Sequence, residues 1–98
     1  MSVAIDPEGA HVAALERLAS FDGTRVCEVG CGDGRITRAI AGRAAGVLAF
    51  DPSPEAIVAA RAALPADLSS RVRFRVGSAR EIEIPRSEFD IVLFSWSL

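Results

Sequence analysis

The 98-residue sequence contains no lysine, no tyrosine, one histidine and only two cysteines. Cys27 and Cys31 have three residues between them, and no second pair of Cys or His residues accompanies them. The sequence therefore predicts neither a metal site nor a disulfide scaffold, and it favours reduced thiols. The longest largely apolar run, residues 44–50, covers seven residues, whereas a membrane span needs about 20. The first residues lack the basic and apolar regions of a signal peptide, so a cytoplasmic location is expected.

An excess of charge of one sign is also missing. The formal net charge is −2, which argues against nucleic acid or an anionic membrane as a general partner. The lone histidine, His11, has no evident partner and is expected at the surface. Half of the residues are hydrophobic, which is enough to build a core. The length fits one domain over residues 1–98.

Segments typical of strands alternate with segments typical of helices. Asp6 and Pro7 predict the start of an N-terminal helix, which is placed within residues 1–22. Strands are expected at residues 25–29, 47–50, 71–76 and 89–94, and further helices at residues 35–45 and 53–64. This alternation predicts an α/β fold with three main helices and a mostly parallel sheet.

A glycine-rich turn, Glu-Val-Gly-Cys-Gly-Asp-Gly at residues 28–34, directly follows the first expected strand and opens a helix. Glycines there permit positive φ and let the backbone approach a ligand. Asp51 follows Gly30 by 21 positions and ends the second expected strand, where a carboxylate can accept both ribose hydroxyls. A tight turn without a ligand, and a turn-forming aspartate, are the plainer alternatives. Together the two features favour a nucleoside site.

The residues around the turn indicate which nucleoside. A dinucleotide-binding loop needs a third small residue where this chain has Arg35, and a P-loop needs a lysine. The acids Glu28 and Asp33 would repel a pyrophosphate but not a cationic sulfonium or an α-amino group. A cation-bearing nucleoside is therefore the expected ligand.

Residues 25–98 resemble the class I S-adenosylmethionine-dependent methyltransferases. Glu28-x-Gly30-x-Gly32-x-Gly34 is similar to the family's first motif, Asp51 to its ribose-binding acid, and residues 89–92 (Phe-Asp-Ile-Val) to its fourth-strand motif. The resemblance implies that S-adenosyl-L-methionine is the cofactor. It places the methionine part near Gly30 and Gly32, with its amino group near Glu28.

The same resemblance assigns the other end of the cofactor. Pro52 would lie against the adenine, Ser78 takes the position where the family often has an acid, and Ser95 and Trp96 would begin the loop that lines the methyl-transfer site. The residues expected to bind the cofactor are Glu28, Gly30, Cys31, Gly32, Asp51, Pro52, Ser78, Ala79 and Ser95. No side chain is convincing as a general base.

The resemblance also implies a Rossmann-like, doubly wound sheet that is incomplete. The family orders its strands 3-2-1-4-5-7-6, and residues 25–98 would supply the first four, in the order 3-2-1-4. The fourth strand would then be an apolar open edge, so pairing with its own copy or with a second chain is expected there. The arginines at 71, 73 and 75 are best explained as charges that protect the other edge, with a nucleic-acid stripe as the less favoured alternative.

The expected function is the cofactor-binding half of a methyltransferase that, when complete, transfers a methyl group to an acceptor of unknown class. Two alternatives remain open. The chain could be a non-catalytic subunit that holds the cofactor, or an inactive truncated fragment.

Overall fold

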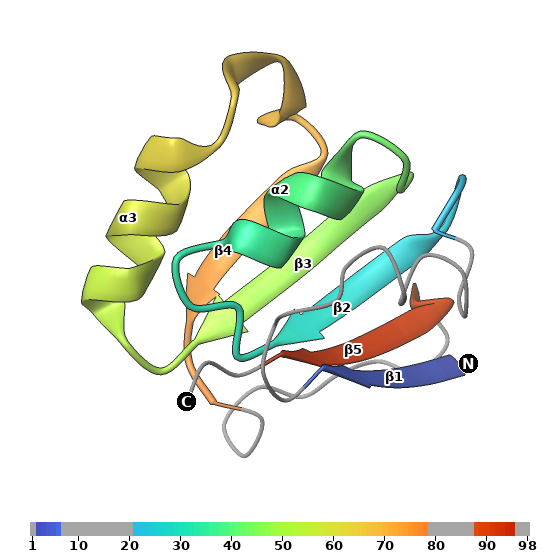
Figure 1. The fold of residues 1–98 in the computed structure, drawn as a ribbon, viewed down its shortest axis with the longest axis horizontal. Helices are drawn as coiled ribbons and strands as arrows, with labels where there is room; N and C mark the ends of the chain where they lie inside the picture. Colours follow the sequence, from blue (N-terminus) through green and yellow to red (C-terminus); the bar gives the residue numbers. More distant parts are fainter. Residues whose placement is uncertain (1, 7–20, 79–87, 96–98) are drawn as a thin grey trace.

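The computed structural model describes residues 2–6, 21–78 and 88–95. Five parallel strands form one sheet in the order β1-β5-β2-β3-β4 (Figure 1). The strands are β1 (Ser2–Asp6), β2 (Arg25–Val29), β3 (Gly46–Asp51), β4 (Val72–Val76) and β5 (Ile91–Ser95). Two α-helices, α2 (Arg35–Ala41) and α3 (Pro54–Ala63), and a short 3-10 helix, η1 (Ala66–Leu68), connect them.

The four strands expected from the sequence lie in the expected order. In chain order they are β2, β3, β4 and β5, and their arrangement β4-β3-β2-β5 corresponds to 3-2-1-4. The Rossmann-like prediction is therefore confirmed, although the described residues contain two α-helices and a 3-10 turn rather than three main helices.

The sheet has an additional strand that the sequence pattern did not indicate. Residues 2–6, which the sequence analysis included with the N-terminal helix, form β1 and pair in parallel with β5 from Ser2↔Ile91 to Asp6↔Ser95. The prediction that β5 is an open edge is wrong, because the backbone of β1 supplies the missing hydrogen bonds. The expected helical stripe downstream of Pro7 lies outside the described residues.

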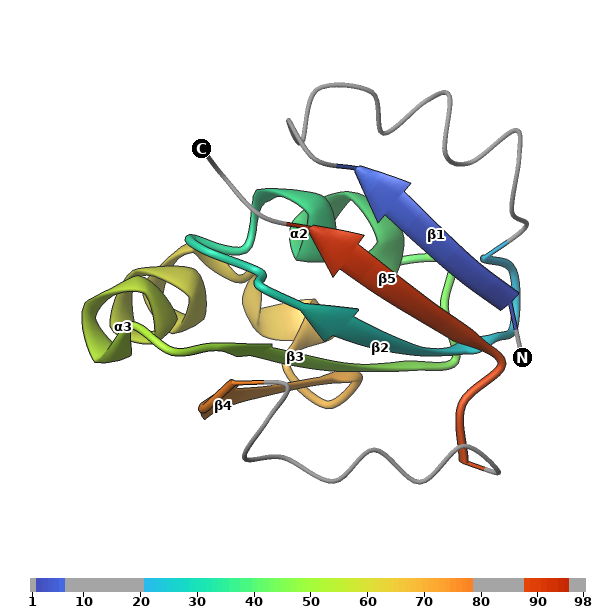
Figure 2. The ribbon, with the colours of Figure 1, turned by 90° about the horizontal axis from the view of Figure 1, so that it is seen from below.

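The sheet buries apolar side chains on both faces, as expected for parallel strands. Both α-helices cover the same face (Figures 1 and 2). The core on that face includes Val26, Ile36, Ala49, Ile57 and Leu93. A smaller cluster on the other face has three buried residues, Cys27, Phe50 and Val92.

Local sequence explains where the helices begin and end. The Ser53 side chain accepts a hydrogen bond from the N–H of Ala56, and Pro54 occupies the first turn of α3. Helix α2 begins after Gly34 and stops at Ala41, before Gly42, which is four residues earlier than the sequence pattern predicted. A glycine loses more conformational freedom in a helix than other residues do, so the helix ends there.

The strand ends opposite the glycine loop are held by Asp90. Its carboxylate accepts a hydrogen bond from the Arg25 backbone N–H at 2.9 Å and lies 3.7 Å from the Arg25 Nε. Its own N–H donates to the Arg25 carbonyl at 2.8 Å. Asp90 thus aligns the starts of β2 and β5. Among the described residues, no helix is long and apolar enough to cross a membrane.

Candidate functional site

The candidate site lies at the carboxyl ends of β2, β3 and β5. The next strand in the chain, β3, lies on one side of β2 in the sheet, and β5 lies on its other side. Ligands of open α/β sheets bind at such a reversal of strand order. The loop of residues 30–34 leaves β2 there and leads into α2 (Figure 1).

Three glycines give this loop its path. Gly30, Gly32 and Gly34 have φ values of 76°, 57° and 83°, all in the left-handed region. Residues with side chains adopt that region at a cost, so the alternation of glycine has a direct conformational reason. The N–H groups of Gly30 and Cys31 both donate to the Phe50 carbonyl, at 2.8 and 3.1 Å. The loop is therefore tied to the end of β3.

Asp51 joins the loop to the start of α3. Its Oδ2 accepts a hydrogen bond from the N–H of Gly32 at 3.0 Å, and its Oδ1 accepts one from the N–H of Ser53 at 2.9 Å. Both bonds are charge-assisted, which makes them stronger than neutral ones. The acid and the glycine loop, 19 residues apart in the sequence, form one unit. Each carboxylate oxygen keeps acceptor capacity for a ligand hydroxyl.

Gly34 has a packing role rather than an exposed one. A Cβ at this position would lie 3.0 Å from the Ala60 Cβ and 3.4 Å from the Phe74 Cζ. The end of the loop therefore packs closely against α3 and β4. The third glycine of the motif is required by its conformation and by this contact, whether or not a ligand is bound.

Glu28 lies beneath the loop and is fully buried. Its Oε1 accepts a hydrogen bond from the hydroxyl of Thr37, which is itself fully buried in α2. Thr37 was not predicted from the sequence. Its signal is a hydroxyl beside Ile36 on the helix stripe that faces the sheet, because a buried hydroxyl needs a partner.

Ser95 ends β5 at the same edge of the sheet. It is buried, and its Oγ has no hydrogen-bond partner among the described residues. Buried polar atoms without a partner are rare in native proteins, and a bound ligand is one way to satisfy them. This hydroxyl lies at the strand end where the family resemblance places the methyl-transfer site.

Cys31 contributes its backbone to the loop but not a reactive thiol. It is 7% exposed, and its Sγ donates to the Gly32 carbonyl at 3.7 Å. Burial, and then the nearby carboxylates of Glu28 and Asp51, raise the pKa of the Cys31 thiol to about 12. Burial and Glu28 raise the pKa of the Cys27 thiol to about 11. Neither cysteine is a nucleophile near neutral pH.

The remaining predicted residues divide by position. Pro52 is exposed next to Asp51. Ser78 follows β4 at the same edge of the sheet, and the N–H of Gly77 donates to the Asp51 carbonyl at 3.0 Å. Ala79 and Trp96 lie outside the described residues. The structure thus brings Glu28, the glycine loop, Asp51, Pro52, Ser78 and Ser95 to one edge of the sheet.

The donors and acceptors at this edge suit a nucleoside that carries an amino acid. Asp51 has oxygen atoms that can accept hydrogen bonds from ribose hydroxyls, and the backbone of the glycine loop can approach a ligand closely. The buried polar side chains of Glu28, from β2, and Ser95, from β5, can bind the amino-acid part. The residues present therefore fit S-adenosylmethionine.

Comparison with known proteins gives the family. A family model described as a methyltransferase domain matches residues 26–98. The chain is 40% identical over 85 residues to the magnesium-protoporphyrin O-methyltransferase of Rhodobacter capsulatus, which covers 86% of this chain and 37% of that protein. It is 33% identical over 76 residues to the ubiquinone biosynthesis O-methyltransferase of Azorhizobium caulinodans, and this match covers 78% of the chain and 30% of that protein. The chain spans about a third of the length of these relatives.

Solved structures share the fold. An S-adenosylmethionine-dependent methyltransferase from Mesorhizobium loti gives a TM-score of 0.75 at 26% identity, over 87% of this chain and 38% of that chain. An RNA methyltransferase from Salinibacter ruber, solved in complex with S-adenosyl-L-homocysteine, gives a TM-score of 0.75 at 29% identity. The match covers 85% of this chain and 55% of that chain. With the family model, the relatives and the strand order in agreement, this chain belongs to the class I S-adenosylmethionine-dependent methyltransferases.

Proposed function

We propose that this chain binds S-adenosylmethionine at the carboxyl ends of β2, β3 and β5, as the cofactor-binding part of a methyltransferase. The observation that carries the proposal is the hydrogen bond from the Gly32 N–H to the Asp51 carboxylate at 3.0 Å. It fixes the ribose-binding acid against the glycine loop, so both halves of a nucleoside amino acid meet preformed partners. Such preorganisation reduces the entropy lost on binding.

Each part of the ligand has its own partners. Asp51 accepts hydrogen bonds from the ribose hydroxyls, and the exposed ring of Pro52 supports the adenine, with Ser78 at its edge. The backbone of Gly30, Cys31 and Gly32 approaches the methionine part. The buried Glu28 and Ser95, below the loop and at the end of β5, accept or donate hydrogen bonds at its amino and carboxylate ends.

The chain contributes binding and orientation rather than acid–base chemistry. When bound, S-adenosylmethionine supplies a methyl group activated by its sulfonium. The loop and Asp51 hold that group in one place, which lowers the entropic part of the barrier. We assign no general base to this chain.

The methyl acceptor is proposed to be an oxygen of a small molecule. The support is that two relatives at 40% and 33% identity carry O-methyltransferase names. A net charge of −2 adds to the case against a nucleic-acid acceptor. The proposed location is the cytoplasm, where the two free, buried thiols would stay reduced.

Calorimetric titration with S-adenosylhomocysteine tests the assignment of Asp51. Loss of its charge-assisted hydrogen bonds costs about 1.5–3 kcal/mol, so Asp51→Ala should weaken binding by roughly 10- to 150-fold. Asp51→Asn, which keeps one acceptor oxygen to hold the loop, should weaken binding less. Asp67→Ala, on η1, removes the same charge away from the site and should bind like the wild type.

Equal affinity in the wild type and Asp51→Ala would remove the ribose assignment. Circular dichroism of each variant separates lost binding from lost folding. A methyl-transfer assay then separates the enzyme from the alternatives. Binding without transfer, in a protein that contains the complete domain, would identify a non-catalytic cofactor-binding subunit.

A further inference from the structure

A groove of about 740 Å³ lies away from the cofactor site, at the amino ends of β2 and β3 and along β4. Its charged and aromatic lining consists of Arg25, Arg71, Arg73, Arg75, Glu88 and Phe89. Its volume falls within the range typical of small-molecule sites. The cofactor site, by contrast, is at the carboxyl ends of the strands, so the two sites are separate.

Two of these arginines are available to a ligand. Arg73 and Arg75 are exposed, and neither side chain has a hydrogen bond or ion pair with any residue that the structure describes. They are two positions apart on β4, so both side chains leave the same face of the strand, with Cα atoms about 6.6 Å apart along it. Their neighbours Val72 and Phe74 face the core beneath α2 and α3.

The strand pairing places these two arginines on the face of the sheet opposite α2 and α3. Arg73 is in register with Leu48, and Arg75 with Phe50. Phe50 belongs to the apolar cluster on that face, and Leu48 packs against it. Leu48 also lines the groove, together with Phe89, so the arginines stand beside apolar surface of the kind that binding sites have.

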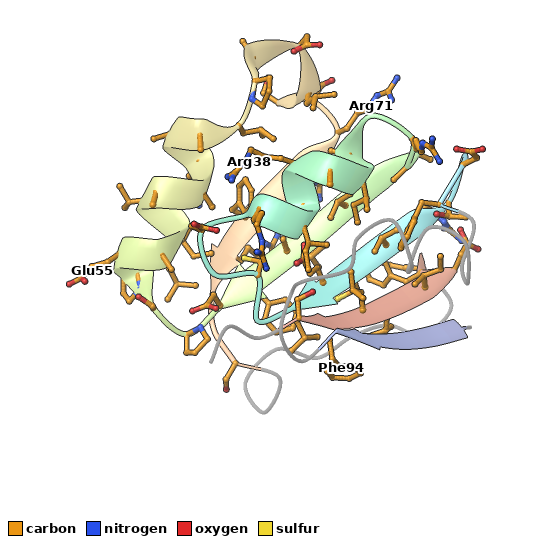
Figure 3. All side chains as sticks on the ribbon, in the orientation of Figure 1. Arg38, Glu55, Arg71 and Phe94 are labelled. Carbon is orange, nitrogen blue, oxygen red and sulfur yellow. The ribbon has the colours of Figure 1, made fainter. Side chains whose placement is uncertain are left out.

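The other two arginines hold the ends of the groove. Arg71 donates a hydrogen bond from Nη1 to the Gly42 carbonyl at 3.1 Å, and its side chain is labelled beside the start of β4 in Figure 3. Arg25 lies 3.7 Å from Asp90. Among the residues that the structure describes, the groove is lined by four arginines, of which Arg25 is paired with Asp90, and by one acid, Glu88. This excess of positive charge favours an anionic ligand.

We propose that this groove binds a small molecule that carries two linked phosphate groups. The planar guanidinium group matches phosphate oxygens with two parallel hydrogen bonds, and two free arginines on alternate positions can each take one phosphate. Leu48 and Phe89 provide an apolar wall for the organic part of such a ligand. The proposal stands on this groove alone and does not depend on cofactor binding.

Titration of the purified chain with inorganic pyrophosphate tests this proposal. Binding is measured by calorimetry and by the NMR chemical shifts of the backbone amides. We expect saturable binding, with shifts at Arg73 and Arg75 and none in the glycine loop. Arg73→Gln and Arg75→Gln should each weaken binding by about 10-fold. Arg73→Lys keeps the charge but loses the two parallel hydrogen bonds of the guanidinium group, so its affinity should lie between those of the wild type and Arg73→Gln.

Arg35→Gln is the matched control, because it removes an exposed arginine outside the groove and should change the affinity by less than about twofold. The proposal is overturned if pyrophosphate does not bind, or if Arg35→Gln weakens binding as much as Arg73→Gln does. It is also overturned if a single-stranded oligonucleotide binds more tightly than pyrophosphate, since the groove would then serve nucleic acid. Circular dichroism verifies that each variant is folded.

Discussion

At the scale of single residues, the glycines of the motif have different jobs. Gly32 presents its N–H to Asp51, so it belongs to the proposed cofactor site. Gly34 ends the loop and packs against α3, where a Cβ would lie 3.0 Å from the Ala60 Cβ. A sequence pattern shows both as the same letter, and only their surroundings separate binding from packing.

Gly34→Ala is therefore expected to reduce the free energy of unfolding. A φ of 83° places an alanine in the left-handed region, which costs about 1–2 kcal/mol, and the contact with Ala60 adds to that. Gly42→Ala is the control, because its added Cβ has nothing within 4 Å and its φ is −69°. This control should be neutral or stabilising by about 0.4–1 kcal/mol. Urea denaturation of the two variants measures the difference, and equal stabilities would contradict the packing role of Gly34.

The raised pKa values of the two thiols make the stability of the fold depend on pH. The pKa values of Cys27 and Cys31 in the folded chain are about 11 and 12, whereas an unfolded thiol titrates near 8.5. Above about pH 9 the unfolded chain releases these protons first, so stability present below that pH is lost as the pH rises. The loss is at most about 1.4 kcal/mol per pH unit for each thiol.

The composition makes this measurement clear, because the chain has no lysine or tyrosine to titrate in the same range. Urea midpoints between pH 8 and 10.5 should fall in the wild type. Cys31→Ala should show a shallower fall over the same range, whatever its stability at pH 8. An identical pH slope in the wild type and in Cys31→Ala would show that this thiol is not held protonated by burial.

At the scale of elements, the β1–β5 pair explains how β5 is covered. Strand β5 is buried over Ile91–Leu93, and a strand of this kind at an open edge would promote association. Parallel pairing with Ser2–Asp6 supplies the ladder instead.

Deletion of residues 1–6 should expose the edge of β5. We expect a lower melting temperature and association that increases with protein concentration, because the free strand can pair with another copy. Sedimentation velocity at several concentrations, with the undeleted chain as the control, measures this. A deleted chain that stays monomeric and melts at the same temperature would show that β1 contributes little to covering β5.

At the scale of the whole molecule, cofactor binding and stability are linked. A ligand that binds only the folded state at ten times its Kd adds about 1.4 kcal/mol to the free energy of unfolding. For a chain of 98 residues, this corresponds to a rise in Tm of about 6–11 °C. S-adenosylhomocysteine should produce this rise, and NADH should not, because the loop lacks the third small residue of a dinucleotide site. A rise with NADH alone would contradict the family's cofactor for this chain.

Much of this molecule could be predicted from the sequence because its signals are local. Short apolar runs, and an alternating run at residues 71–76, predicted the four strands from β2 to β5. Glycines 30, 32 and 34 predicted the loop, and Asp51 its acid. Ser53 and Pro54 marked the start of α3. Each of these signals depends on a few neighbouring residues, whose turn preferences and periodicity are set by the backbone itself.

Tertiary structure decided the features that depend on contacts between distant residues. The pairing of Ser2 with Ile91, the bond from Gly32 to Asp51 and the contact of Gly34 with Ala60 all follow from strand register and from the packing of α3 on the sheet. The same register places Arg73 beside Leu48 and turns an edge stripe into the lining of a groove. A local pattern shows which face a side chain takes, but only the folded sheet determines what lies beside it.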